Sequence, residues 1–273
     1  MRRRGVEMKK QYKLLILVQL VLLGIGSVFD FQISQSIFNR GSFFSEFFKI
    51  FGELPLTLMS VLAALIKVFN YYDEKKMIKS TLFGLLSILF AMMLGFQIPH
   101  YLDINSIVLS IAIILGVMVL SFILINKMDL NRRKELDNFA NIVLLTAFLS
   151  ILVINVIKIF WGRMRFFKMV ELNDYSNFTP WYLAQSIAES DVYKSFPSGH
   201  SANAAIVLLI NYLYLNSKHE NKVFVISSMW LFLVQISRIM DGAHFMSDVA
   251  MGGLIAILIQ MMLVKRLSDD KYA

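Results

Sequence analysis

The chain of 273 residues contains no cysteine. This absence excludes disulfide bonds, zinc–thiolate sites, iron–sulfur clusters and a cysteine nucleophile. Charge is also scarce, because only 17% of the residues are charged whereas 57% are hydrophobic. A soluble domain of this length would carry more charge, so the composition predicts a polytopic membrane protein.

Proline and histidine are rare as well, with four residues of each. No proline-rich linker, low-complexity tract or internal repeat is visible, which favours a single integral membrane domain over residues 1–273. The four histidines are His100, His200, His219 and His244. We assign no role to His100, expected in a short outer turn after Pro99, or to His219, expected in a cytoplasmic loop.

Eight apolar runs are each compatible with a membrane helix of roughly 17–25 residues, the first and sixth being short. They cover residues 13–29, 54–70, 79–96, 105–126, 138–160, 200–216, 223–240 and 246–264. The runs predict an all-α bundle of about eight transmembrane helices in a cell membrane.

The polar segments between these runs alternate in charge along the chain. The segments 1–13, 66–80, 126–137, 216–222 and 265–273 together hold 19 of the 27 Lys and Arg residues. By the positive-inside rule, both termini are expected in the cytoplasm and residues 197–200 on the far side of the membrane. The net charge of +8 is then explained by cytoplasmic segments that face anionic lipid, rather than by binding to nucleic acid.

The N-terminal region resembles a signal peptide in its basic start and its apolar run Leu14–Phe29. No A-x-A-like site follows and Asp30 ends the run, so we expect a retained first span. In the segment 30–53, helical spacing of aromatic residues predicts a helix in the outer interface, which caps the bundle or forms a lip for lipid entry. These residues are Phe43, Phe44, Phe47, Phe48 and Phe51.

The first polar cluster lies at the outer end of the fifth run. Lys158 and Arg165 are seven residues apart, so both would share one helix face if the helix continued. Gly162 would loosen that turn. Snorkelling to lipid headgroups is an alternative explanation, although an outer boundary is the unusual side for basic residues.

The second cluster is the sequence FPSGHS at Phe196–Ser201. Pro197 suits a first helical turn, Ser198 can cap a helix, and Gly199 lets the backbone approach a ligand. The start of a helix here would bind an anion, with His200 at its rim as a proton donor or acceptor. A plain helix cap with an incidental histidine is the alternative.

The third cluster, Ser237–Asp248, bridges the last two apolar runs. His244 and Asp248 are four residues apart and share a helix face. A carboxylate beside an imidazole fixes its tautomer and leaves the other ring nitrogen free to attack. The alternative is a structural histidine–aspartate pair. We interpret Asp241 as a turn residue before Gly242.

Together the clusters bring three permanent cations, Lys158, Arg165 and Arg238, to the same membrane depth as two histidines. Such an array is costly in a membrane protein unless a dianion binds it. It suits phosphoryl transfer, in which one histidine attacks phosphorus and the other protonates the leaving oxygen. No acidic cage for Mg²⁺ accompanies the cations, so we expect neither metal nor other cofactor.

The three motifs K-x6-R, PSGH and SR-x5-H-x3-D resemble those of the type 2 phosphatidic acid phosphatase superfamily. These membrane lipid phosphatases share their active site with vanadium haloperoxidases. The resemblance implies that His244 becomes phosphohistidine, that Asp248 orients it and that His200 protonates the leaving group. It also implies a phosphate-binding set of Lys158, Arg165, Ser198, Gly199 and Arg238.

The chain departs from the pattern of this superfamily in two respects. Phe166 stands where a proline usually follows the first-motif arginine. The superfamily core also has six spans, three of them before the first motif, whereas five apolar runs precede that motif here. We therefore expect the motif-bearing core at about 138–265 and interpret the runs 79–96 and 105–126 as two additional spans.

The resemblance implies hydrolysis of a lipid phosphate at the extracytoplasmic face, with polyprenyl diphosphate, phosphatidylglycerol phosphate or phosphatidic acid as substrate. The expected partners are this substrate and the membrane lipids. One alternative is a phosphotransferase that passes the group from phosphohistidine to a lipid or sugar. Another is a lipid-phosphate flippase or binding protein, which would need the cations but not the pair His244 and Asp248.

Overall fold

A computed structural model describes residues 2–269 of the chain, with side chains described for 10–266. The described part is helical, with short 3-10 turns η1 (Asp191–Tyr193) and η2 (Ala205–Leu209). The α-helices are α1 (Arg2–Ile37), α2 (Phe43–Phe51), α3 (Leu54–Asp73), α4 (Met77–Tyr101), α5 (Ile107–Asn126), α6 (Leu130–Glu135), α7 (Asp137–Trp161), α8 (Phe166–Leu172), α9 (Gly199–Ala204), α10 (Ile210–Tyr214), α11 (Glu220–Met240) and α12 (Met246–Asp269).

Seven helical stretches in the described residues are long and apolar enough to cross a membrane. They coincide with seven of the eight predicted runs, which confirms the polytopic helical bundle. The remaining run, 200–216, consists of α9, η2 and α10 in series rather than one helix. At the junction, the side-chain amide of Gln260 donates a hydrogen bond to the Ala205 carbonyl (2.8 Å), and such side-chain insertion favours a local break.

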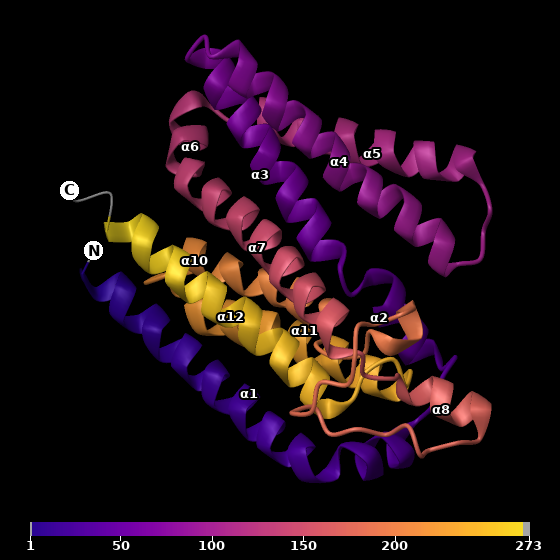
Figure 1. Cartoon of the computed structure of the whole chain (residues 1–273). Coiled ribbons are helices and arrows are strands. Elements are labelled where there is room, and N and C mark those ends of the chain that lie inside the picture. The colour runs from indigo at the N-terminus through magenta and orange to yellow at the C-terminus, as the bar shows by residue number, and fades with distance from the viewer. Residues whose placement is uncertain (1, 270–273) are drawn as a thin grey trace.

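Small residues allow the central helices to approach one another closely. α12 packs against α1, α7 and α9, whereas α3 packs against α7 on one side and α4 on the other. The helices α4 and α5 therefore lie beyond α3, away from α1 and α12 (Figure 1). Fully buried alanines line the contacts, namely Ala63, Ala64, Ala140, Ala147, Ala204 and Ala256.

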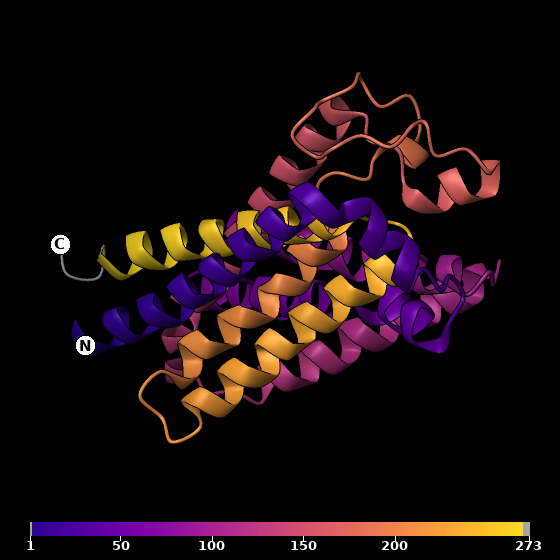
Figure 2. The same cartoon turned by 90° about the horizontal axis from the view of Figure 1, so that it is seen from below.

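The two ends of the bundle differ in what they hold. α1 begins and α12 ends at one end, together with the connections α3–α4 and α5–α6 (Figure 1). The opposite end carries α2, α8 and the long segment 173–198, which Figure 2 shows gathered beside that end of the bundle. The predicted basic segments 66–80 and 126–137 therefore lie at the same end of the bundle as the start of α1 and the end of α12.

The prediction that Asp30 ends the first apolar helix is wrong. α1 continues to Ile37, and Asp30 is buried within it. A buried carboxylate is tolerated here because Arg163 pairs with it (2.9 Å). The predicted helix in 30–53 is present as α2, where the Ser42 hydroxyl caps the helix by accepting a hydrogen bond from the Ser45 amide (3.2 Å).

Candidate active site

A cavity of about 620 Å³ opens at the end of the bundle that carries α2 and α8. Its walls come from the ends of α4, α7 and α11, the start of α9 and the connecting segments. Six of the eight predicted site residues line it: Lys158, Arg165, Gly199, His200, Arg238 and His244. Residues that lie far apart in the sequence thus meet around one space.

Lys158 and Arg165 reach the cavity by a route that differs from the predicted one. α7 ends at Trp161 because Gly162 adopts a left-handed conformation (φ +61°), as is common after a helix C-terminus. The helix therefore does not continue through Arg165, and the break falls at Gly162, where the sequence predicted a loosened turn. Arg165 returns to the cavity on an extended segment and pairs with Asp191 (2.9 Å).

The guanidinium groups around the cavity keep buried donors without partners. Arg238 pairs through one nitrogen with Asp241, but its Nε and Nη1 have no hydrogen-bond partner among the described residues. The Nε of Arg165 is likewise buried and unpaired in the described part of the chain. Buried charged donors are normally satisfied, so this arrangement calls for an anion.

Ser198 lies behind the cavity rather than in its lining. The helix α9 begins at Gly199, and the fully buried Ser198 side chain caps it by accepting a hydrogen bond from the Ser201 amide (3.3 Å). The predicted cap is therefore present. Ser198 is not among the residues that line the cavity, and its predicted contact with phosphate stays a prediction.

A glycine on α12 allows the turn before α9 to pack closely. A Cβ at position 252 would lie 2.2 Å from the carbonyl oxygen of Ser198, so only Gly252 fits there. The amide of Ser198 also donates a hydrogen bond to the Asp248 carbonyl (2.9 Å). The N-terminal part of α12 therefore fixes the position of the turn that carries His200.

His244 is oriented by a backbone carbonyl rather than directly by Asp248. Its Nδ1 lies 2.6 Å from the Ser195 carbonyl oxygen and 4.0 Å from Oδ2 of Asp248. Because a carbonyl can only accept, Nδ1 carries the proton and Nε2 keeps its lone pair. Burial, followed by the nearby cations, holds the pKa of His244 well below its usual 6.5, which favours this neutral form.

The predicted hydrogen bond from His244 to Asp248 is thus replaced by an indirect connection. Oδ2 of Asp248 accepts hydrogen bonds from the Ser195 hydroxyl (2.5 Å) and the Phe245 amide (2.8 Å), whereas Oδ1 is engaged by Arg163. Asp248 therefore holds the segment whose carbonyl orients the imidazole.

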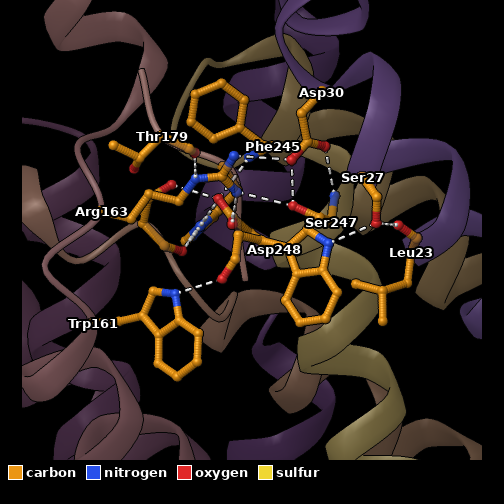
Figure 3. A network of polar contacts seen from close by, with 12 residues as sticks. Leu23, Ser27, Asp30, Trp161, Arg163, Thr179, Phe245, Ser247 and Asp248 are labelled. Carbon is orange, nitrogen blue, oxygen red and sulfur yellow. Dashed lines mark hydrogen bonds and ion pairs between the residues drawn. The ribbon is translucent and has the colours of Figure 1, made fainter. Parts of the chain in front are cut away.

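Arg163 is the central residue of the buried network beside His244. Its guanidinium donates to Asp248 (2.5 Å), to Asp30 (2.9 Å) and to the Thr179 carbonyl (2.9 Å), and it lies over the Phe245 ring (4.1 Å). Figure 3 shows Arg163 reaching toward both carboxylates. We did not assign this arginine a role from the sequence, because its partner Asp30 is 133 residues away.

Glu53 is a second site residue that the sequence motifs do not indicate. It lies at the start of α3, where its carboxylate accepts hydrogen bonds from Gln97 (2.7 Å) and Asn203 (2.9 Å). One oxygen is 3.5 Å from Nδ1 of His200. The position of this acidic residue at the outer end of the apolar run 54–70 was the one sequence feature that pointed to Glu53. His100 also lines the cavity, since α4 extends beyond the expected turn to Tyr101.

Phe166 occupies the first helical position of α8, a position that proline also suits. Its ring is buried and packs edge-on against Phe31 (5.9 Å between centroids), Phe38 (5.4 Å) and Phe245 (6.1 Å). The departure from the expected proline therefore places an aromatic cluster beside the cavity.

A membrane helical bundle with His200, His244 and unpaired guanidinium donors around one cavity is suited to bind a phosphate group. Residues 139–271 match the model of the PAP2 superfamily, so this segment of the chain is similar to that superfamily. The predicted resemblance is thus confirmed. All eight predicted site residues lie within the matched segment, whereas Asp30 and Glu53 lie outside it.

Phosphatidylglycerophosphatase B from Bacillus subtilis (strain 168) is 44% identical to this chain over 77 residues. The match covers 26% of this chain and 37% of that protein, well under two thirds of its length. No solved structure matches the chain.

Proposed function

We propose that the protein is a metal-independent lipid phosphatase that works through a phosphohistidine intermediate. The observation that carries this proposal is the cavity, which combines a neutral imidazole with buried, unpaired guanidinium donors. The donors of Lys158, Arg165 and Arg238 are placed to stabilise the equatorial oxygens of a transferring phosphoryl group. The match of residues 139–271 to the PAP2 superfamily supports the same activity.

The first step forms a phosphorus–nitrogen bond at Nε2 of His244 and breaks the bond from phosphorus to the lipid oxygen. That oxygen takes a proton from His200 and leaves as the lipid alcohol. In the second step His200 accepts a proton from water, which attacks the phosphohistidine. The phosphorus–nitrogen bond breaks, inorganic phosphate leaves and His244 is restored.

The proposed substrate is phosphatidylglycerol phosphate, because the similar Bacillus subtilis protein carries the name phosphatidylglycerophosphatase B. Phosphatidic acid and polyprenyl diphosphate present the same dianionic group and belong in the same assay. We place the reaction at the extracytoplasmic face, because the cavity lies at the end opposite the basic connections.

Replacing the nucleophile tests this proposal. His244→Ala in the purified protein should lower phosphate release from phosphatidylglycerol phosphate by at least about a thousandfold, because no other group can form the intermediate. His219→Ala is the matched control, since His219 is exposed at the start of α11 and should leave turnover unchanged.

Trapping the intermediate provides a second measurement. Quenching the wild-type protein without acid, after brief reaction with ³²P-labelled substrate, should leave label on His244. Undiminished turnover in His244→Ala would contradict the mechanism. Absence of phosphate release from every lipid phosphate in the panel would contradict the proposed activity itself.

A further inference from the structure

An apolar groove of about 490 Å³ lies between α4 and α7, both of which are candidate membrane spans. On the α4 side it is lined by Phe83, Leu86 and Phe90. The facing residues of α7 include Leu144 and Phe148. α3 packs against both helices, which spaces α4 and α7 on either side of it (Figure 1).

The groove and the cavity of the candidate active site share one lining residue. Ile151 lines both spaces. On α7, Leu144, Phe148 and Ile151 are followed by Asn155 and Lys158 at spacings of four and three residues, which places all of them on one helix face. This face is apolar along the groove and turns polar at the cavity.

The α4 wall shows the same change of character along its length. Phe83, Leu86 and Phe90 face the groove, whereas His100 and Tyr101 at the end of the same helix line the cavity. Walls from two different helices are therefore apolar along the groove and polar at the cavity. A molecule that matches both spaces has a long hydrocarbon part joined to an anionic head.

We propose that the groove between α4 and α7 binds the hydrocarbon chain of the same lipid whose phosphate occupies the cavity. This inference rests on the proposed function. Along α7 the groove runs from Asn141 to Leu152, roughly 16 Å of helix, which is about half of the ~30 Å hydrocarbon core of a bilayer. The groove is therefore one leaflet deep and begins directly below the headgroup cavity.

This binding site is a property of this chain beyond its superfamily segment. α4 (77–101) lies outside residues 139–271, so one wall of the groove comes from a helix that the superfamily model does not cover. The additional helices thus acquire a role as the part of the protein that selects the lipid chain.

Chain-length selectivity tests the proposal. Dipalmitoyl and dihexanoyl phosphatidic acid are each assayed in the same detergent micelles, and the readout is the ratio of their kcat/KM values. The fraction of active protein cancels in this ratio, so partial misfolding of a variant does not affect it. Leu86→Trp, which fills the groove, should lower the long-to-short ratio at least about fivefold.

Matched controls separate the groove from the general membrane surface. Leu85→Trp places the same bulk on the adjacent, 55% exposed position of α4 and should leave the ratio unchanged. Phe148→Ala, which removes a groove wall, should also lower the ratio. Phe160→Ala, at a similarly exposed position of α7 outside the groove, should leave it unchanged (62% and 61% exposed).

The outcomes distinguish this inference from the proposed function. If the wild-type protein hydrolyses both lipids and neither Leu86→Trp nor Phe148→Ala changes the ratio, the groove does not bind the substrate chain. A change of equal size in the controls would overturn the proposal as well. If the wild-type protein hydrolyses no lipid phosphate, it is the proposed function that fails.

Discussion

At the scale of single residues, His200 and His244 each have an acidic residue that supports them. Asp248 holds the Ser195 segment whose carbonyl orients His244. Glu53 is fixed by Gln97 and Asn203 and lies beside His200. Burial lowers the pKa of His200 to about 4, and the carboxylate of Glu53 opposes this shift, which favours the protonated imidazole that a general acid requires.

Replacing Glu53 should therefore affect the chemical step more than substrate binding. We expect Glu53→Gln to lower kcat about tenfold or more, with KM changed less than about twofold, because proton donation to the leaving oxygen is impaired. Steady-state kinetics on phosphatidylglycerol phosphate measures both values.

Glu46→Gln on α2 is the control for this substitution, because within the described residues Glu46 pairs with Lys49 on the same helix (3.1 Å) and its replacement should leave kcat unchanged. An increase in KM with kcat unchanged would assign Glu53 a role in binding instead. Unchanged kinetics would show that the carboxylate does not position His200.

At the scale of helices, the N-terminal part of α12 organises the site. Within two turns it supplies Asp248 to the Ser195 segment and presents Gly252 to the turn at Ser198. Ser247 also contacts Asp30 of α1, donating from its amide (2.9 Å) and its hydroxyl. The start of this helix thus connects the two histidine-bearing segments to the rest of the bundle.

Adding one methyl group at Gly252 should disturb this arrangement. Gly252→Ala places a Cβ against the Ser198 carbonyl, so we expect about 1–3 kcal/mol of destabilisation and a lower kcat. Thermal unfolding of the detergent-purified protein and the phosphatase assay measure the two effects.

Gly116→Ala is the matched control, since nothing lies within 4 Å of a Cβ at that position in the helix α5. It should be neutral or slightly stabilising, because alanine is the better helix former. Equal unfolding temperatures and rates for Gly252→Ala and the wild-type protein would show that the close approach is not required.

The sequence indicated the helices and six residues of the cavity lining, because both leave local signals. Apolar runs mark the spans, and motif spacing marks residues such as Lys158 and His244. The path of the backbone between these residues and the contacts between distant helices left no such local signal. Gly162 ends α7 with a left-handed turn, and the pairing of Asp30 with Arg163 depends on how distant helices pack.

The break within 199–214 has a similar origin. Gln260 lies on another helix, so its hydrogen bond to the Ala205 carbonyl was not visible in the local pattern. Ser198 caps α9 from behind the cavity, and sequence spacing alone does not distinguish a lining side chain from a capping one.

At the scale of the whole molecule, the bundle has a basic end and a cavity end. The natural absence of cysteine allows its orientation to be measured with single introduced thiols. Asn105 is exposed between α4 and α5 at the cavity end, and Asn131 is exposed on α6 at the other end. This pair compares the same substitution on the two sides.

We expect a membrane-impermeant maleimide to label Asn105→Cys, but not Asn131→Cys, in intact cells, because the positive-inside rule places the α6 end in the cytoplasm. Both variants should be labelled after the membrane is permeabilised. Labelling of only Asn131→Cys in intact cells would reverse the proposed orientation.

The buried guanidinium of Arg163 also decides how far this protein can be shortened. One of its two carboxylate partners, Asp30, belongs to the first helix and lies far upstream of residues 139–271. Truncation at that boundary would leave a desolvated positive charge with half of its compensation, a loss that typically costs about 3–5 kcal/mol. The segment that matches the superfamily model is therefore shorter than the part of the chain that folds as a unit. Any shortened variant of the protein has to retain α1.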